Sequence, residues 1–153
     1  MLETGMKAPE FSLPNEKNDV VSLNDFKGRK LVLYFYPKDS TPGCTTEARG
    51  FSARLKEFEA ANTVILGASK DSLKRHLNFI AKQELTISLV SDEEGILCEA
   101  YGVWILKKLY GREYMGIERA TFLIDEDGVI RNIWRKVKVK GHVDAVLEAA
   151  QTL

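Results

Sequence analysis

Strand-like and helix-like patterns alternate along the chain after residue 30, and this alternation restricts the possible folds more than any other feature of the sequence. Short apolar runs typical of buried strands alternate with amphipathic helical patterns at residues 31–36, 45–60, 63–68, 72–84, 86–90 and 96–101. Because each helix has to bury its apolar face on the sheet that the strands build, this succession predicts a layered α/β fold.

The C-terminal part of the chain predicts two further strands and a helix. Residues 120–124 and 129–139 flank the step from Asp127 to Gly128, and an Asp-Gly step between apolar runs is typical of a hairpin. These two strands would be antiparallel, so the complete sheet would be mixed. Residues 142–151 repeat apolar side chains at helical spacing, and we expect a final helix there that packs on the sheet.

Two segments lie outside this predicted core. Residues 11–14 and 20–23 predict a small hairpin before the main sheet. Residues 102–118 have no clean period and contain three glycines, so we expect a loop there. The predicted fold class is α/β, with a central mixed sheet flanked by helices and an N-terminal hairpin extension.

Length, charge and apolar content limit the number of domains and the kinds of binding partner that we expect. A chain of 153 residues is expected to form one domain, residues 1–153, with a core that needs no disulfide or metal. Lys plus Arg and Asp plus Glu number 22 each, so no bulk charge favours nucleic acid or a membrane surface as a partner. No apolar run approaches the roughly 20 residues that span a bilayer. A small molecule or another protein is the expected partner.

Only two cysteines occur, Cys44 and Cys98, and the first residues do not have the pattern of a secretory signal. A disulfide scaffold is therefore not indicated, and we expect a cytoplasmic protein. Cys44 follows the buried strand at residues 31–36 and lies where Thr41 and Pro42 predict the start of a helix, with Thr41 as the cap. A thiolate at that place is favoured by the free N–H groups and the helix dipole.

The residues around Cys44 limit its chemistry. The residue three places later is Glu47, so the second sulfur of a dithiol exchange motif is missing. Attack on an activated carbonyl would call for a histidine as base, and we expect both His76 and His142 on the surface. A lone activated thiolate instead suits two-electron attack on an electrophile such as a peroxide O–O bond.

The sequence resembles a known family over nearly its whole length. Tyr36-Pro37 and the run from Thr41 to Ala48, together with the run from Gly116 to Asp125, are similar to the peroxiredoxins, and most of all to their bacterioferritin comigratory protein group, also called the Q-type. The resemblance extends from about Pro9 to the last helix. It implies a thioredoxin-like fold and thiol-dependent reduction of hydrogen peroxide and organic hydroperoxides.

The resemblance also implies roles for particular residues. Cys44 would be the nucleophile, the hydroxyl of Thr41 would hold the peroxide in line with the sulfur, and Arg119 would stabilise the thiolate and the developing oxygen anion. Pro37 and Pro42 would shape the pocket. The backbone N–H groups near Gly43 would donate to oxygen, and Glu47 would orient the arginine. Without the resemblance, Thr41 could be only a helix cap and Pro37 only a strand end.

The thiol that restores the oxidised Cys44 is open. Many relatives carry a second cysteine five residues later or in the following helix, but these places hold Arg49 and Ile80 here. Cys98 remains, in a short amphipathic stretch where we expect a core residue. We favour a one-cysteine mechanism with thioredoxin, glutaredoxin or glutathione as the external thiol. A two-cysteine peroxidase that uses Cys98 is the alternative.

Two other functions stay open at this stage. The chain could be a disulfide oxidoreductase that uses Cys44 alone, as monothiol glutaredoxins do, or a thioredoxin-fold module that binds clients without catalysis. The resemblance implies a monomer and neither a metal nor an organic cofactor.

Overall fold

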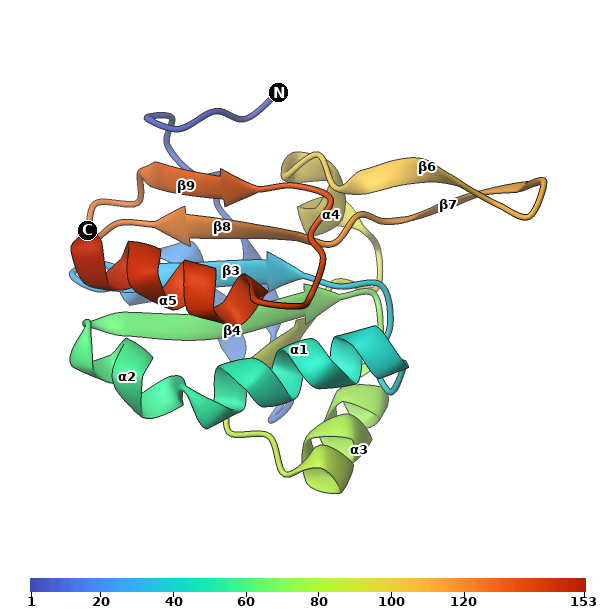
Figure 1. Ribbon diagram of the computed structural model, residues 1–153, viewed down its shortest axis with the longest axis horizontal. Helices are drawn as coiled ribbons and strands as arrows, with labels where there is room; N and C mark the ends of the chain where they lie inside the picture. The colour runs from blue at the N-terminus through green and yellow to red at the C-terminus, as the bar shows by residue number, and fades with distance from the viewer.

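A central five-stranded sheet organises the computed structural model, which describes residues 1–153 (Figure 1). In spatial order its strands are β5 (Ser88–Ser91), β4 (Thr63–Ser69), β3 (Lys30–Phe35), β8 (Ala120–Ile124) and β9 (Ile130–Trp134). β3, β4 and β5 run parallel, whereas β8 is antiparallel to β3 and β9 is antiparallel to β8. The predicted mixed sheet is confirmed.

The middle strand β3 explains why residues 31–36 are apolar without interruption. Val32 and Tyr34 belong to one buried cluster, whereas Leu33 and Phe35 belong to a second buried cluster. Successive side chains of a strand point to opposite faces, so the two clusters lie on the two sides of the sheet. Because both faces of β3 are covered, both sets of side chains have to be apolar.

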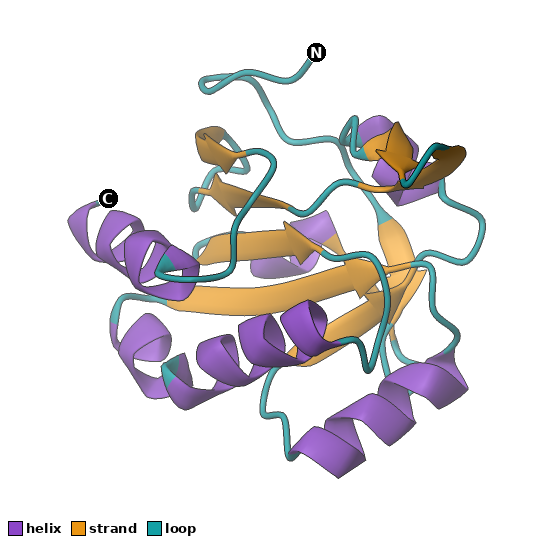
Figure 2. Cartoon of the chain, turned by 45° about the vertical axis from the view of Figure 1, so that its right-hand side comes forward, coloured by secondary structure: helices purple, strands orange, loops and turns teal.

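Helices cover both faces of this sheet (Figure 2). The cluster around Tyr34 receives side chains from α1 (Pro42–Ala53), α2 (Leu55–Ala60), α3 (Leu73–Gln83) and α5 (His142–Thr152). The cluster around Phe35 receives them from α4 (Ile96–Ala100), which lies behind the sheet in Figure 1. None of these helices has the length and apolar character that a membrane crossing requires.

The predicted N-terminal hairpin is also confirmed. β1 (Ser12–Pro14) and β2 (Val20–Ser22) form a separate antiparallel pair, and the short 3-10 helix η1 (Leu23–Phe26) follows. Leu13 and Val21 pack against the cluster that contains Phe35. The hairpin therefore covers the same face of the sheet as α4.

The loop prediction for residues 102–118 is wrong. This segment forms an antiparallel hairpin of β6 (Trp104–Leu109) and β7 (Arg112–Ile117), which projects from the body of the molecule (Figure 1). Tyr110 and Gly111 make the turn with φ angles of 50° and 76°, as a two-residue turn of type I′ needs. Most of the hairpin is exposed on both faces, so it lacks the alternation that half-burial imposes on a strand.

Two other predicted segments have different boundaries. The helix expected at residues 45–60 is divided at Arg54, whose backbone leaves helical geometry with φ −105° and ψ 9°. No Gly or Pro marks that position in the sequence. The strand expected at residues 129–139 ends at Trp134, because Glu118 accepts bonds from the Arg135 guanidinium and the Lys136 N–H and so draws the chain out of the sheet.

Candidate active site

α1 begins at Pro42, after a short segment that follows the carboxyl end of β3. Thr41 is the N-cap residue, Pro42 occupies the first position of the helix, and Cys44 is the third residue, with 1% of its surface exposed. The backbone N–H groups of Gly43 and Cys44 have no acceptor within the protein. Free donors in the first turn of a helix favour an anion at that point.

Arg119 brings a positive charge to this helix start. Phe35 pairs with Ala120 in the register of β3 and β8, so Arg119 lies level with the end of β3. Its Nη2 is 3.5 Å from the Sγ atom of Cys44, and its Nη1 donates to Oε1 of Glu47 over 2.6 Å. The structure therefore joins Cys44, Arg119 and Glu47, which are up to 75 residues apart in sequence.

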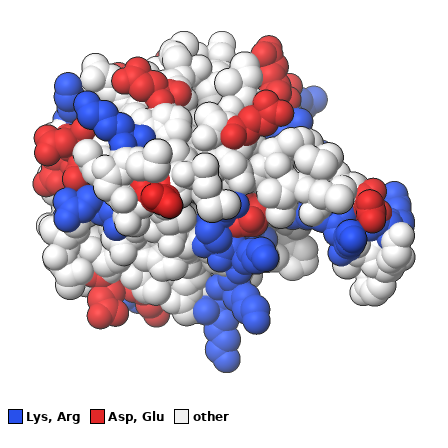
Figure 3. All heavy atoms as spheres, turned by 90° about the horizontal axis from the view of Figure 1, so that it is seen from above, with Lys and Arg blue, Asp and Glu red and all other residues white.

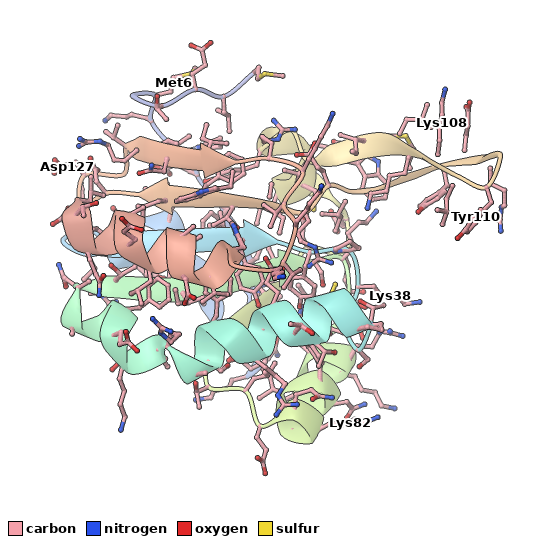
Figure 4. The ribbon with its side chains drawn as sticks, viewed as in Figure 1. Met6, Lys38, Lys82, Lys108, Tyr110 and Asp127 are labelled. Carbon is pink, nitrogen blue, oxygen red and sulfur yellow. The ribbon has the colours of Figure 1, made fainter.

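Thr41 and Pro37 lie in the segment that connects β3 to α1. The hydroxyl of Thr41 donates to the carbonyl of Lys38 over 2.9 Å and makes no capping bond to α1. The expected side-chain cap is thus wrong, although Thr41 does hold the N-cap position. Pro37 lies two residues after the end of β3 and is half-buried, and Lys38 points outward beside the start of α1 (Figure 4).

A network of buried ionisable groups stands behind Arg119. Burial raises the pKa of Glu47 to about 7, even though the Arg119 guanidinium opposes that shift. Burial and the charge of Arg119 lower the pKa of His142 to about 4, so this imidazole is neutral. Its Nε2 lies 4.0 Å from Oε2 of Glu47 and 2.8 Å from the hydroxyl of Thr121. Glu47 Oε2 itself has no hydrogen-bond partner.

Both histidines are buried, and the prediction that they lie on the surface is wrong. His142 is 6% exposed and His76 is fully covered. Nδ1 of His76 is 2.6 Å from Oδ2 of Asp39, and its Nε2 is 2.9 Å from the carbonyl oxygen of Val90. Their partners are distant in sequence, so nothing in the neighbouring residues indicated this burial.

One buried group has the residue types of a metal site. Ligand atoms of Asp39, Asp71 and His76 lie within 4.8 Å of one another. However, these atoms already bond to protein groups, because Asp71 accepts from the Asp39 N–H and the Ser69 hydroxyl while His76 contacts Asp39. The arrangement is a closed hydrogen-bond network rather than an open set of ligands.

Cys98 lies on the other side of the sheet from Cys44. It belongs to the buried cluster around Phe35, whereas Cys44 belongs to the cluster around Tyr34, and both thiols are free. Burial and the Asp92 carboxylate raise the pKa of Cys98. The expectation that Cys98 is a core residue is confirmed.

The β6–β7 hairpin flanks the site. Burial and the charge of Arg119 lower the pKa of Lys107, on β6, and the influence of Cys44 opposes this shift. Figure 3 shows both signs of charge on the face that it presents, including the hairpin at the right. Tyr110 at the tip points away from the body of the molecule (Figure 4). The base of the hairpin therefore borders the site, and its tip lies in solvent.

The fold and the site together define a class of protein. A mixed sheet with helices on both faces, and a cysteine in the first turn of a helix with a guanidinium beside its sulfur, are the features of a thioredoxin-like thiol peroxidase.

Comparison with known proteins identifies the family within this class. Residues 4–133 match the AhpC/TSA family, so the chain belongs to this family of peroxiredoxins. Peroxiredoxin Bcp of Bacillus subtilis is 51% identical over 152 residues, which cover 99% of this chain and 95% of that protein. Peroxiredoxin Bcp of Escherichia coli is 42% identical over 146 residues, which cover 95% of this chain and 94% of that protein.

Solved structures agree with this assignment. A structure of Xanthomonas campestris Peroxiredoxin Q has a TM-score of 0.89 and 49% identity, covering 93% of this chain and 90% of that chain. A mutant PrxQ from Xylella fastidiosa has a TM-score of 0.94 and 41% identity, covering 99% of this chain and 97% of that chain. The predicted thioredoxin-like fold and the resemblance to Q-type peroxiredoxins are confirmed.

Proposed function

We propose that this protein reduces hydrogen peroxide and organic hydroperoxides through the thiolate of Cys44. The observation that carries the proposal is the Arg119 guanidinium 3.5 Å from Sγ, beside the free N–H groups of Gly43 and Cys44. These donors stabilise a thiolate before the reaction. They also face the oxygen that gains negative charge while the O–O bond breaks, and such aligned donors are worth several kcal/mol.

The chemical step begins when Sγ of Cys44 attacks the nearer peroxide oxygen. An S–O bond forms, the O–O bond breaks, and its electron pair goes to the departing oxygen, which takes up a proton and leaves as water or an alcohol. Cys44 becomes a sulfenic acid. The hydroxyl of Thr41 turns from Lys38 toward the peroxide and holds it in line, and Pro37 and Pro42 limit the access of water.

Organic hydroperoxides belong in the proposed substrate class for two reasons. One related solved structure, at 48% identity, concerns the alkyl peroxide reduction activity of the Xanthomonas campestris bacterioferritin comigratory protein. In this chain the hairpin beside the site exposes apolar side chains that could contact an alkyl group: Leu106, Leu109, Tyr114 and Met115.

We propose further that an external thiol resolves the sulfenic acid. The position of Cys98 supports this choice, because a disulfide needs Cα atoms closer than about 7 Å and the sheet separates the two thiols. Cys44 is buried, so the first turn of α1 has to unwind before a bulky thiol such as thioredoxin or glutaredoxin can reach it. Glutathione needs a smaller opening.

The decisive experiment measures peroxide consumption with thioredoxin, glutaredoxin or glutathione supplied. We expect turnover by the wild type, a loss of at least about 10³-fold for Cys44→Ser, and full activity for Cys98→Ser. Insulin reduction without peroxide turnover would instead identify a disulfide oxidoreductase. Equal peroxide consumption by wild type and Cys44→Ser would reject the proposal.

Two measurements test the resolving step. Peptide mapping of peroxide-treated protein should find no stoichiometric bridge between Cys44 and Cys98, and such a bridge would establish the two-cysteine alternative. Hydrogen exchange in residues 45–51 should rise after oxidation. Unchanged exchange there would rule out unwinding of α1.

We propose that residues 1–153 act as one domain and as a monomer. A reducing compartment such as the cytoplasm suits a chain whose two thiols are both free.

A further inference from the structure

The segment that carries Thr41 is fixed by a group of buried residues that has no part in the chemistry described above. Asp39 lies between β3 and α1 and is 2% exposed. Its Oδ2 is 2.6 Å from Nδ1 of His76 on α3, and its Oδ1 accepts from the Tyr36 hydroxyl over 2.6 Å. Its backbone N–H donates to Asp71 over 2.8 Å. Asp39 is therefore held from three sides.

The contacts of His76 require an additional proton. Nδ1 faces a carboxylate oxygen and Nε2 faces the carbonyl oxygen of Val90, and neither of these acceptors carries a hydrogen of its own. A neutral imidazole has one N–H and can satisfy only one of them. Both contacts are made together only when the Asp39–His76 pair holds one proton more than a carboxylate and a neutral imidazole, as an imidazolium does.

The charged groups around His76 agree with this state. Burial lowers the pKa of His76, but Asp39, the Val90 carbonyl and Asp71 raise it, and the net shift is upward. The other neighbours are the Tyr36 phenol, whose pKa is raised by burial, and Arg75, which pairs with Asp71.

The pair acts on the site through one strained residue. Ser40 follows Asp39 and has a φ of 66°, in the left-handed region that residues other than glycine rarely adopt. Thr41, the N-cap of α1, comes next. The bonds of Asp39 thus fix the residue that precedes this left-handed position, and the backbone there sets where Thr41 and the first turn of α1 lie.

We propose that Asp39 and His76 form a protonated positioning pair that holds the peroxide site in its reactive geometry, and that the loss of its proton loosens the site. The inference rests on the proposed function of Cys44. When the proton leaves, one of the two ring contacts becomes a repulsion between lone pairs, and the segment from Asp39 to Thr41 loses an anchor. The prediction is a fall in kcat/KM on the alkaline side of the titration.

The test compares Asp39→Ala with Asp39→Asn, and Asp144→Asn serves as a control that removes an exposed carboxylate paired with Arg54. An Asn at position 39 donates to a neutral His76 and still accepts from Tyr36, so it keeps the geometry without the extra proton. We expect kcat/KM to fall roughly 10- to 100-fold for Asp39→Ala. Asp39→Asn should stay within about threefold of wild type at pH 7 and lose the alkaline fall.

Two measurements do not depend on turnover. NMR of the wild type should show two protected ring N–H protons on His76, and hydrogen exchange at Cys44 and Thr45 should rise in Asp39→Ala but not in Asp39→Asn. One ring N–H, a pH profile shared by wild type and Asp39→Asn, or unchanged exchange in Asp39→Ala would overturn the inference. An inactive wild type would reject only the proposed function, because exchange and NMR still decide the role of the pair.

Discussion

Cys44 and Cys98 occupy the same place in two helices but have opposite surroundings. Each is the third residue of its helix, and each is almost fully buried. Beside Cys44 the N–H groups are free, and the guanidinium of Arg119 lies 3.5 Å from the sulfur. In α4 the carboxylate of Asp92 accepts the N–H groups of Leu97 and Cys98 over 3.1 and 2.8 Å.

On the proposed mechanism, this difference explains why Cys44 and not Cys98 is the reactive cysteine. Position in the first turn of a helix is common to both thiols, so it is not sufficient. In α4 the donors are occupied by a carboxylate; burial and the negative charge of this carboxylate raise the pKa of Cys98. At α1 the donors are free and the adjacent charge is positive. The charge that faces the sulfur distinguishes the two regions.

Among changes to the surroundings of the two thiols, removal of that charge should have the largest effect. We expect Arg119→Gln to lower kcat/KM for hydrogen peroxide by about 10²- to 10³-fold, because a donor to the developing oxygen anion is lost. Steady-state kinetics with a fixed reductant would measure this. Arg131→Gln, which removes a guanidinium paired with Asp125 at the other end of the sheet, should remain near wild type. Activity of Arg119→Gln within threefold of wild type would contradict the comparison.

The buried groups behind Cys44 should produce two opposing pH dependences of stability. Glu47, with a pKa raised to about 7, favours the folded state below pH 4.5, and that contribution is lost as the pH rises to 7. His142, with a pKa lowered to about 4, contributes above pH 6.5 and loses this as the pH falls to 4. Each contribution amounts to about 3 kcal/mol, so they offset each other in the wild type.

Single variants should separate these two contributions. In urea unfolding between pH 4 and 7, the free energy of unfolding of Glu47→Gln should rise with pH more steeply than that of wild type. That of His142→Asn should fall with pH instead. Glu148→Gln removes an exposed carboxyl on α5 and should match wild type. Parallel curves for all the variants would show that the buried network does not titrate in this way.

A smaller loss of kcat/KM should result from a side chain that displaces Arg119. A Cβ atom at Gly43 would lie 3.1 Å from Nη2 of Arg119, so Gly43→Ala should displace the guanidinium by a few tenths of an ångström. We expect about a tenfold loss in kcat/KM. Gly50→Ala is the matched control, because it lies in the same helix and meets Val143 at 3.0 Å instead. An equal loss of activity in both variants would point to a general effect on α1.

The smallest effect is expected at the other cysteine. Asp92→Asn removes the charge that caps α4 and should cost about 1 kcal/mol of stability, measured by urea unfolding, while peroxide turnover stays unchanged. Glu94→Gln alters an exposed neighbour that makes no bond to α4 and should have no effect. A drop in turnover for Asp92→Asn would mean that the two cysteine regions are coupled.

Burial explains which parts of the fold could be predicted. Residues 31–36 and 63–68 are covered, so their apolar character indicated strands, and both were found. The β6–β7 hairpin has water on both faces and carried no such pattern. The polar partners of His76 and His142 are 37 and 21 residues away, so the neighbouring residues did not indicate them. Both histidines were therefore expected on the surface.

The residues of the candidate site also differ in how far the local sequence could indicate them. Cys44 and Thr41 are close in sequence, and the helix start at Pro42 indicated the place of both, whereas the role of Glu47 came from the resemblance to a family. Arg119 required the resemblance to a family, because without it a charge beside a strand is usually solvated. Asp39 was missed, although an acidic residue in the short segment between a buried strand and the proposed nucleophile was a visible signal.

The sheet that separates the two sulfurs has a consequence for the protein in use. On the proposed mechanism, no disulfide inside the chain can take over the oxidation of Cys44, since the only other thiol, Cys98, lies on the opposite face of the sheet. In every catalytic cycle the oxidation of Cys44 then has to pass to another molecule. When much peroxide arrives at once, the activity that the enzyme retains would depend on how quickly external thiols can reduce the sulfenic acid.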